Sequence, residues 1–269
     1  MNLRTLKLTL TYDGTRLVGW QRQAAGESVQ GLLEAALARL EGAPVTVHGA
    51  GRTDAGVHAL GQVASAQLTC EHPPDVLRRA LNASLPPDVR VVDVHHVDHA
   101  FHARFSARAK TYRYLLRNGA IVSPFEHRYV WQVPECLDLG AMQIAAQSLV
   151  GSHDFAAFRS TGSTSTTTVR TIVRSEMSAQ TGSVWLLPPC EPDGAQPGGV
   201  DESRLLVYEV SGSGFLRHMV RALVGTLVDI GRGRHSPEWM AALLEDGHRA
   251  EAGATAPAQG LFLVRVDYH

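Results

Sequence analysis

The sequence predicts an α+β fold, in which helices cover a sheet of largely neighbouring strands. Residues 6–12 alternate Leu and Tyr with Thr and Lys, which is the period-two pattern of a half-buried strand. Residues 29–41 repeat apolar side chains at the spacing of an amphipathic helix, and Ser28 is placed to cap it. Predicted strands often follow one another with no helix between them, which favours α+β over a doubly wound sheet.

The other elements follow from the same patterns and from turn residues. In the first half we expect two short strands around a glycine-rich stretch, then a helix opened by Pro74 and a further strand: 45–48, 62–68, 74–85 and 89–97. In the second half we expect strands at 110–118, 184–187, 205–210 and 260–268, and helices at 137–150, within 211–231 and at 236–245. The Ser- and Thr-rich residues 160–168 predict a mobile loop, and the Pro- and Gly-rich residues 188–202 predict a disordered hairpin tip.

Length and composition indicate a soluble globular protein with one large domain or two smaller ones. The chain has 269 residues, of which 44% are apolar, and no stretch approaches the roughly 20 apolar residues of a membrane span. The first residues alternate instead of forming an apolar run, so no signal peptide is visible. Three distant cysteines, Cys70, Cys136 and Cys190, fit reduced thiols in the cytoplasm and offer no zinc motif.

A glycine-rich loop at residues 49–61 is the first candidate site. Its four glycines and three alanines leave the backbone open to close approach by a large partner. Arg52 and Asp54 are the two charges that stand out from this bare stretch. An Asp on a glycine-rich loop between strands is a candidate catalytic carboxylate, and the alternative is an Asx turn that closes the loop. The residue pattern alone leaves both interpretations open.

The run from Gly51 to Ala59 reads Gly, Arg, Thr, Asp, Ala, Gly, Val, His, Ala. It resembles the signature of the tRNA pseudouridine synthases of the A type, which isomerise uridines at positions 38, 39 and 40 of the anticodon stem and loop. The resemblance implies that Asp54 is the catalytic residue. It also implies the pseudouridine synthase fold, in which two similar lobes form a mainly antiparallel sheet flanked by helices, with the active-site cleft between them. We expect these lobes at residues 1–106 and 107–269.

Three more segments carry the resemblance. Tyr112 opens a Tyr, Arg, Tyr triplet, and the resemblance places it against the target base. Arg221 ends a Phe, Leu, Arg, His, Met, Val, Arg run, and the resemblance pairs it with Asp54; without the resemblance, Arg221 reads as a snorkelling surface residue. The closing strand begins near Leu261, which the resemblance places in the wall of the uracil pocket. Arg170 is a candidate substrate contact, although the Cys, Gln and Ser that family members often carry near it are missing here.

A basic and aromatic segment predicts a nucleic-acid surface despite a formal net charge of only −1. Between His99 and Phe125 there is no acidic residue, and the segment carries Arg104, Arg108, Lys110, Arg113 and Arg117 interleaved with Phe101, Phe105, Tyr112 and Tyr114. Cations neutralise phosphates and rings stack on bases, so Arg108 and Lys110, with Arg52 from the loop, are candidate substrate contacts. The alternative is a strand with one solvated basic face and one buried aromatic face.

The implied reaction sets what the residues must supply. Pseudouridine formation breaks the bond between ribose C1′ and uracil N1 and rejoins the base through C5, so stoichiometry requires no cofactor. An ionised carboxylate must either attack the sugar carbon or remove a ribose proton, and the sequence leaves both routes open. A neighbouring Arg221 would favour the ionised form of Asp54. The target nucleotide must also be flipped out of its stack, and Arg52 would fill the vacated space or hold a flanking phosphate while Tyr112 stacks on the detached uracil.

Two other classes of function remain open. One is a non-catalytic tRNA-binding or tRNA-folding protein on the same scaffold. The other is a metal-dependent hydrolase built on His95, His96, His99 and His102, but these histidines have no Glu or Cys partner at a recognised spacing, so we predict no metal site. The resemblance further implies a homodimer in which one tRNA spans both subunits.

Overall fold

The computed structural model divides the chain into two compact units, Met1–Thr111 with Phe262–His269, and Tyr112–Leu261. It describes residues 3–160, 166–180, 204–245, 248 and 251–268. Among the residues that it describes, no helix has the length and apolar character needed to cross a membrane.

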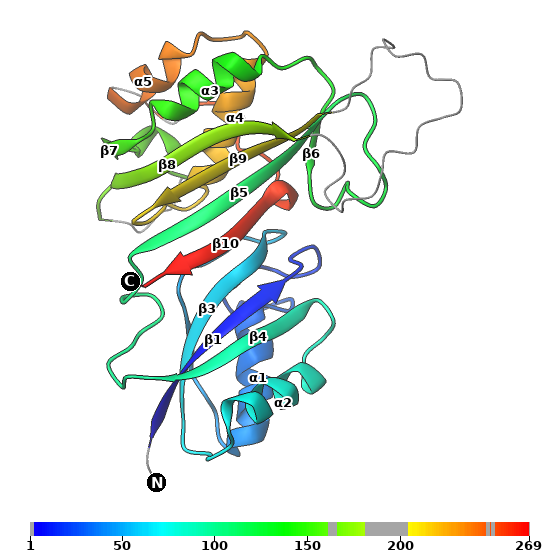
Figure 1. Ribbon diagram of the computed structural model, residues 1–269, viewed down its shortest axis with the longest axis vertical. Helices are drawn as coiled ribbons and strands as arrows, with labels where there is room; N and C mark the ends of the chain where they lie inside the picture. Colours follow the sequence, from blue (N-terminus) through cyan, green and yellow to red (C-terminus); the bar gives the residue numbers. More distant parts are fainter. Residues whose placement is uncertain (1–2, 161–165, 181–203, 246–247, 249–250, 269) are drawn as a thin grey trace. The chain divides into compact units, whose positions relative to one another are not determined.

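Four strands form the main sheet of the first unit in the order β4-β1-β3-β10 (Figure 1). These strands are β1 (Arg4–Tyr12), β3 (His58–Leu68), β4 (Val89–Val97) and β10 (Leu261–Asp267). β1 pairs antiparallel with both β3 and β4, so that Leu8 lies opposite Ala64 on one side and Val94 on the other. β10 runs parallel to β3, and the short strand β2 (Val47–Gly49) pairs antiparallel with β3.

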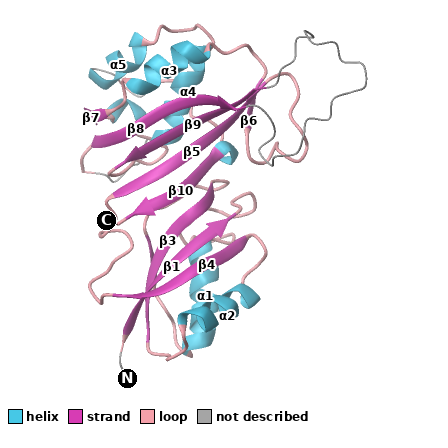
Figure 2. Cartoon of the chain, viewed as in Figure 1, coloured by secondary structure: helices cyan, strands magenta, loops and turns pink. Residues whose placement is uncertain are grey.

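Two helices of the first unit pack on its sheet (Figure 2). Helix α1 (Val29–Glu41) begins where the Ser28 side chain accepts a hydrogen bond from the Gly31 N–H, and it ends at Gly42 with φ of 76°. Helix α2 (Pro74–Ser84) is opened by proline. Both helices match the ranges predicted from the sequence because their start signals and apolar stripes are local features.

The second unit places β5 (Ala109–Asn118), β9 (Arg204–Gly212), β8 (Val169–Gln180) and β7 (Gly151–Asp154) side by side in that order. β9 pairs antiparallel with β8, and β8 with β7, while the short β6 (Trp131–Val133) runs parallel to β5. Helices α3 (Leu139–Gln147), α4 (Met219–Gly231) and α5 (Glu238–Glu245) lie on one side of this sheet (Figure 1). Two short 3₁₀ segments complete the unit, η1 (Ala156–Phe158) and η2 (Ala258–Gly260).

The predicted α+β class with a mainly antiparallel sheet is confirmed, and several boundaries differ. Helix α3 is shorter than 137–150 because the Asp138 side chain caps it by accepting from the Ala141 N–H. Helix α4 begins only at Met219, because His218 before it has a left-handed backbone with φ of 62°. The predicted strand at 184–187 and the hairpin tip at 188–202 lie outside the described residues, as does the centre of the predicted 160–168 loop.

The C-terminal strand belongs with the N-terminal part of the chain. Strand β10 pairs with β3 through Phe262 opposite His58, and residues 262–269 therefore join the first unit. The predicted lobes, 1–106 and 107–269, instead assign this strand to the second half and begin that half before Tyr112. Pairing between strands so distant in the sequence leaves no local signal, so a division by sequence position does not contain it.

Candidate active site

The loop that carries Asp54 connects β2 to β3 in the first unit. It is shorter than the predicted 49–61 stretch because β3 already begins at His58. At its start, the Ala50 N–H donates to the Val63 carbonyl at 2.7 Å, and the Gln62 side-chain amide donates to the Gly51 carbonyl at 3.0 Å. These two bonds tie the beginning of the loop to β3.

The backbone on either side of Asp54 is held by hydrogen bonds. The Trp20 N–H donates to the Thr53 carbonyl at 3.0 Å, and the Val57 N–H donates to the Asp54 carbonyl at 3.2 Å. The Thr53 hydroxyl lies 2.8 Å from the Tyr12 hydroxyl in the protein interior. Burial raises the pKa of Tyr12 to about 12, so this phenol stays neutral and keeps its hydrogen-bonding proton. Asp54 is therefore presented from a backbone with a defined conformation.

Glycines allow neighbouring segments to approach this loop closely. A Cβ at Gly19 would lie 2.6 Å from the Thr53 carbonyl oxygen, and Gly19 also has φ of +102°. A Cβ at Gly14 would lie 2.1 Å from the Val57 carbonyl oxygen. No side chain fits at such distances, so the segment that follows β1 packs its bare backbone against the Asp54 loop.

Asp54 is partly exposed on this loop, and Arg52 is exposed beside it. Lys110, near the start of β5, lies beside the same loop. A Cβ added at Gly51 would be 3.5 Å from its Nζ. Burial, followed by the charge of Arg104, lowers the pKa of Lys110. Arg108 is exposed, and its backbone N–H donates to the Asp267 carbonyl at 2.8 Å. The structure thus brings Lys110 to the Asp54 loop, which sequence spacing did not predict.

Tyr112 lies buried at the start of the second unit, with its ring edge-on to Phe215 at 5.1 Å between centroids. Phe215 belongs to the segment between β9 and α4 and is partly exposed. The helix predicted within 211–231 gave no indication of this contact. The sequence around Phe215 does not indicate which ring it contacts, because Tyr112 is distant in the chain.

Arg221 lies in the first turn of α4 and is fixed by Ala256. Its Nε donates to the Ala256 carbonyl at 2.7 Å, and the Ala256 N–H donates to the Arg221 carbonyl at 3.1 Å. Burial raises the pKa of Tyr114, and the nearby charge of Arg221 opposes this rise. Arg221 is therefore an oriented, partly buried cation, unlike a snorkelling surface residue. Asp54 belongs to the other unit, so their ion pair stays a prediction.

Arg170 and Leu261 complete the predicted set. Arg170 lies over Gly214, where a Cβ would be 3.7 Å from its Nε, and its Nη1 donates to the Val169 carbonyl at 2.6 Å. It therefore neighbours the same loop that carries Phe215. Leu261 is buried as the first residue of β10.

The basic and aromatic segment does not present all its charges to solvent. Arg113 donates to Glu209 at 2.8 Å, and Arg117 forms a buried ion pair with Glu126 at 2.7 Å. Carboxylates therefore engage both cations: Arg117 is buried and needs such a partner, whereas the Arg113 side chain stays partly exposed. Arg104, Arg108 and Lys110 have no carboxylate within ion-pair distance among the described residues.

The histidines of the 95–102 segment are arranged for other contacts. His95 lies 2.6 Å from Asp93 on the surface, while His102 packs against His48 with 4.7 Å between ring centroids. Within the part of the chain that the structure describes, no group of three or more His, Cys, Asp or Glu side chains is arranged to hold a metal ion.

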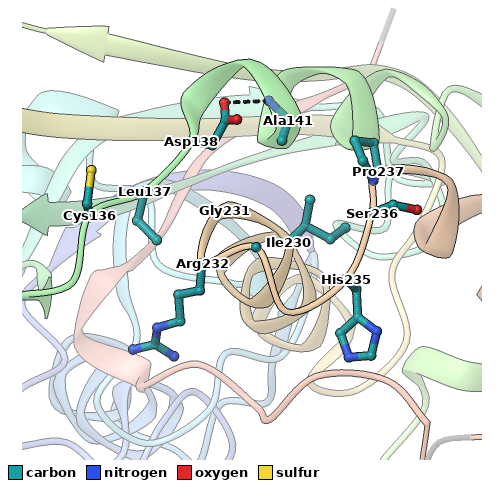
Figure 3. Close-up of a pocket in the computed structure, with 11 residues that line it drawn as sticks. Cys136, Leu137, Asp138, Ala141, Ile230, Gly231, Arg232, His235, Ser236 and Pro237 are labelled. Atoms are coloured by element: carbon teal, nitrogen blue, oxygen red, sulfur yellow. Dashed lines mark hydrogen bonds between the residues drawn. The ribbon is translucent and has the colours of Figure 1, made fainter.

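A shallow pocket of about 560 Å³ lies in the second unit, where α3 begins and α4 ends (Figure 3). Cys136, Arg232 and His235 are among its lining residues, and Asp138 at its edge is engaged as the cap of α3. None of the predicted site residues lines it. We therefore do not assign the reaction to this pocket.

Comparison with known proteins identifies the family. A family model described as tRNA pseudouridine synthase matches residues 9–106 and 145–269. A tRNA pseudouridine synthase A from Solidesulfovibrio magneticus is 46% identical over 269 residues, covering 98% of this chain and 90% of that protein. Another, from Syntrophotalea carbinolica, is 43% identical over 266 residues, covering 99% of this chain and 97% of that protein. The chain belongs to the tRNA pseudouridine synthase family, enzymes that isomerise uridine to pseudouridine in tRNA.

Proposed function

We propose that this chain forms pseudouridine at positions 38, 39 and 40 of the tRNA anticodon arm, with Asp54 as the catalytic residue. One observation carries the assignment of Asp54. Asp54 is a partly exposed residue on a loop whose backbone is held at Thr53 and at Asp54 itself. A catalytic group must be held in position by its surroundings while a substrate can still reach it, and this placement supports the assignment.

The reaction assigns a definite task to Asp54. The bond between ribose C1′ and uracil N1 breaks, the uracil turns, and a bond forms between C1′ and C5. The C5 hydrogen then leaves as a proton, and N1 carries a proton in the product. Ionised Asp54 either attacks C1′ or removes a ribose proton, so both routes require its charged form. The guanidinium of Arg221, held by Ala256 in the second unit, would pair with Asp54 and favour that form.

The remaining residues bind the extruded nucleoside and its flanking phosphates. Tyr112 would stack on the detached uracil, and Leu261 would line the uracil pocket. Arg52, Arg108, Lys110 and Arg170 are the proposed phosphate contacts. No cofactor enters the stoichiometry, since the reaction adds no group and changes no oxidation state.

We place the reaction in the cytoplasm, where tRNA is modified, and propose that the enzyme acts as a homodimer. A subunit pair would let one tRNA contact both copies. Sedimentation of the purified protein with and without tRNA tests the dimer directly, and a monomer that turns over tRNA at a rate linear in enzyme concentration would contradict it.

The proposed function is tested by mapping pseudouridine in tRNA with carbodiimide, using RNA from a strain that lacks this gene. Wild-type protein should modify the anticodon arm, whereas Asp54→Asn should yield no product. Affinity for tRNA should stay within about tenfold, because the change removes a charge and little volume. Asp75→Asn, which alters an exposed carboxylate on α2, is the matched control and should retain turnover.

The two possible failures of this experiment have different meanings. Turnover by Asp54→Asn would remove the catalytic assignment. Tight tRNA binding by the wild-type protein with no modification at any site would instead favour the non-catalytic RNA-binding alternative.

A further inference from the structure

Three aromatic rings of the first unit contact one another in a row along the protein surface, each ring tilted relative to the next. His48, next to the Asp54 loop in β2, lies 4.7 Å from His102 between ring centroids, and His102 lies 4.4 Å from Phe105. Phe105 is 78% exposed, which is unusual for so large an apolar side chain. The Arg104 guanidinium carbon lies 5.7 Å from the centre of the Phe105 ring. An exposed ring beside a cation is the combination that binds bases of single-stranded nucleic acid.

The segment that carries Phe105 is held rigidly. The buried Ala103 donates its N–H to the Ser65 hydroxyl at 3.1 Å and accepts at its carbonyl from the Tyr268 hydroxyl at 2.8 Å. The Ser106 N–H donates to the His102 carbonyl at 2.9 Å, and the Ser106 hydroxyl accepts from the His102 N–H. A ring presented from a fixed backbone loses little conformational entropy when a partner binds, so this exposure is preorganised.

His102 supports the exposed ring as a neutral imidazole. Its Nδ1 accepts hydrogen bonds from the backbone N–H groups of Arg104 at 3.1 Å and Phe105 at 3.4 Å. Burial, and then the nearby His48 and Arg104, lower the pKa of His102. Because Nδ1 is an acceptor, the ring orientation is tied to the backbone that positions Phe105.

The row of rings formed by His48, His102 and Phe105 lies close to the Asp54 loop within the same unit. Ala103 packs in a buried cluster with Ala50, the residue before Gly51. Lys110 extends the positive charge from Arg104 toward Gly51. Burial, and then the charge of Arg104, lower the pKa of Lys110. The charges complement phosphates, and the flat exposed ring complements an unstacked base.

We propose that Phe105, supported by His102, is a stacking platform for an unpaired nucleotide near the target uridine, with Arg104 contacting the adjacent phosphate. This rests on the proposed function for the identity of the RNA, and it adds a positioning residue that is distinct from the groups acting on the target base. An unpaired base, and not a paired stem, is the occupant because only an unstacked base exposes a face to Phe105.

The test measures binding of full-length protein to an anticodon stem–loop RNA and to a blunt duplex of the same stem. Phe105→Ala should weaken stem–loop binding about tenfold and leave duplex binding within about twofold of wild type. Phe105→Trp should restore stem–loop binding, because it retains a stacking ring. Phe125→Ala removes an equally exposed ring, 74% accessible, from the second unit and is the matched control, expected to bind like wild type.

A fluorescent base gives a readout that a purely structural role would not move. With 2-aminopurine placed in turn at each loop position, wild-type protein should quench one position strongly, and Phe105→Ala should lose that quenching. Unchanged stem–loop binding by Phe105→Ala, or an equal loss by Phe125→Ala, would overturn the proposal. A change in sedimentation of Phe105→Ala without RNA would also overturn it, since the ring would then belong to a subunit interface.

The experiments distinguish a failure of the stacking platform from a failure of the proposed function. Asp54→Asn should quench the fluorescent base at the same loop position as wild type, because it leaves Phe105 unchanged, and its affinity should stay within the tenfold range given above. If Asp54→Asn still formed pseudouridine while Phe105→Ala lost binding, the catalytic assignment would be wrong and the platform would stand. Normal binding by Phe105→Ala alongside an inactive Asp54→Asn would give the reverse result.

Discussion

The predicted site residues of the first unit and those of the second are held by different physical means. In the first unit, the Asp54 loop is fixed by close backbone approach, with Gly14 and Gly19 leaving no room for a side chain. In the second unit, Arg221 is fixed by reciprocal hydrogen bonds with Ala256, and Tyr112 by a ring contact with Phe215. The loop is therefore sensitive to any added atom, whereas the second unit should tolerate changes that keep the hydrogen bond or the ring.

The largest effect is expected from removing the cation of the second unit. Arg221→Gln should lower the single-turnover rate about a hundredfold or more, because the proposed partner Asp54 would lose its stabilising charge. Arg221→Lys keeps the charge but loses the planar donor to Ala256, so its rate should lie in between. Arg234→Gln, which removes a cation paired with Asp229 beyond the other end of α4, is the control. Wild-type turnover in Arg221→Gln would limit this arginine to a structural role.

A smaller effect is expected from adding one methyl group beside the Asp54 loop. Gly19→Ala should lower turnover about tenfold and reduce the free energy of unfolding by about 2–3 kcal/mol, because its Cβ would overlap the Thr53 carbonyl. Gly42→Ala has a similar positive φ but no atom within 4 Å of its Cβ, so it should cost only about 1 kcal/mol and keep turnover. Rapid-quench kinetics and thermal melts measure both. Equal behaviour of the two variants would show that steric contact at Gly19 does not position the loop.

The contact between Tyr112 and Phe215 should tolerate a conservative substitution better than the close backbone contacts at the glycines do. Tyr112→Phe keeps the edge-on packing with Phe215 and should retain turnover within about threefold, whereas Tyr112→Ala should lose about tenfold or more. The measurement is kcat and KM on unmodified tRNA, with circular dichroism to verify folding. Wild-type activity in both variants would remove the stacking role.

The smallest effect is expected at His218, whose left-handed backbone precedes α4. His218→Asn should change the free energy of unfolding by less than about 0.5 kcal/mol, because Asn tolerates positive φ. His218→Val should lose about 1–2 kcal/mol, because a β-branched side chain is strained there. Denaturant unfolding measures both. Equal stability of the two variants would mean that α4 is not started by this backbone turn.

Local signals explain which parts of the site could be predicted. The caps and stripe of α1 lie within a short window, so the sequence located this helix correctly. Arg52 and Asp54 stand in one continuous motif, and their role in the site stays a prediction. The contacts of Phe215 and Lys110 join segments far apart in the chain and were missed. The sequence also offered no sign that Arg113 pairs with Glu209, because the two residues lie 96 positions apart.

By itself, the sequence determined the α+β class, most element ranges, the Asp54 motif and the family resemblance, because each depends on residues close together in the chain or on a contiguous pattern. Only the tertiary structure decided that Ala256 orients Arg221, that Gly14 and Gly19 pack against the Asp54 loop, and that Phe105 stays exposed while Tyr114 is buried. Burial and contact depend on which distant segments meet, and alternation along one strand does not encode the surface that covers it.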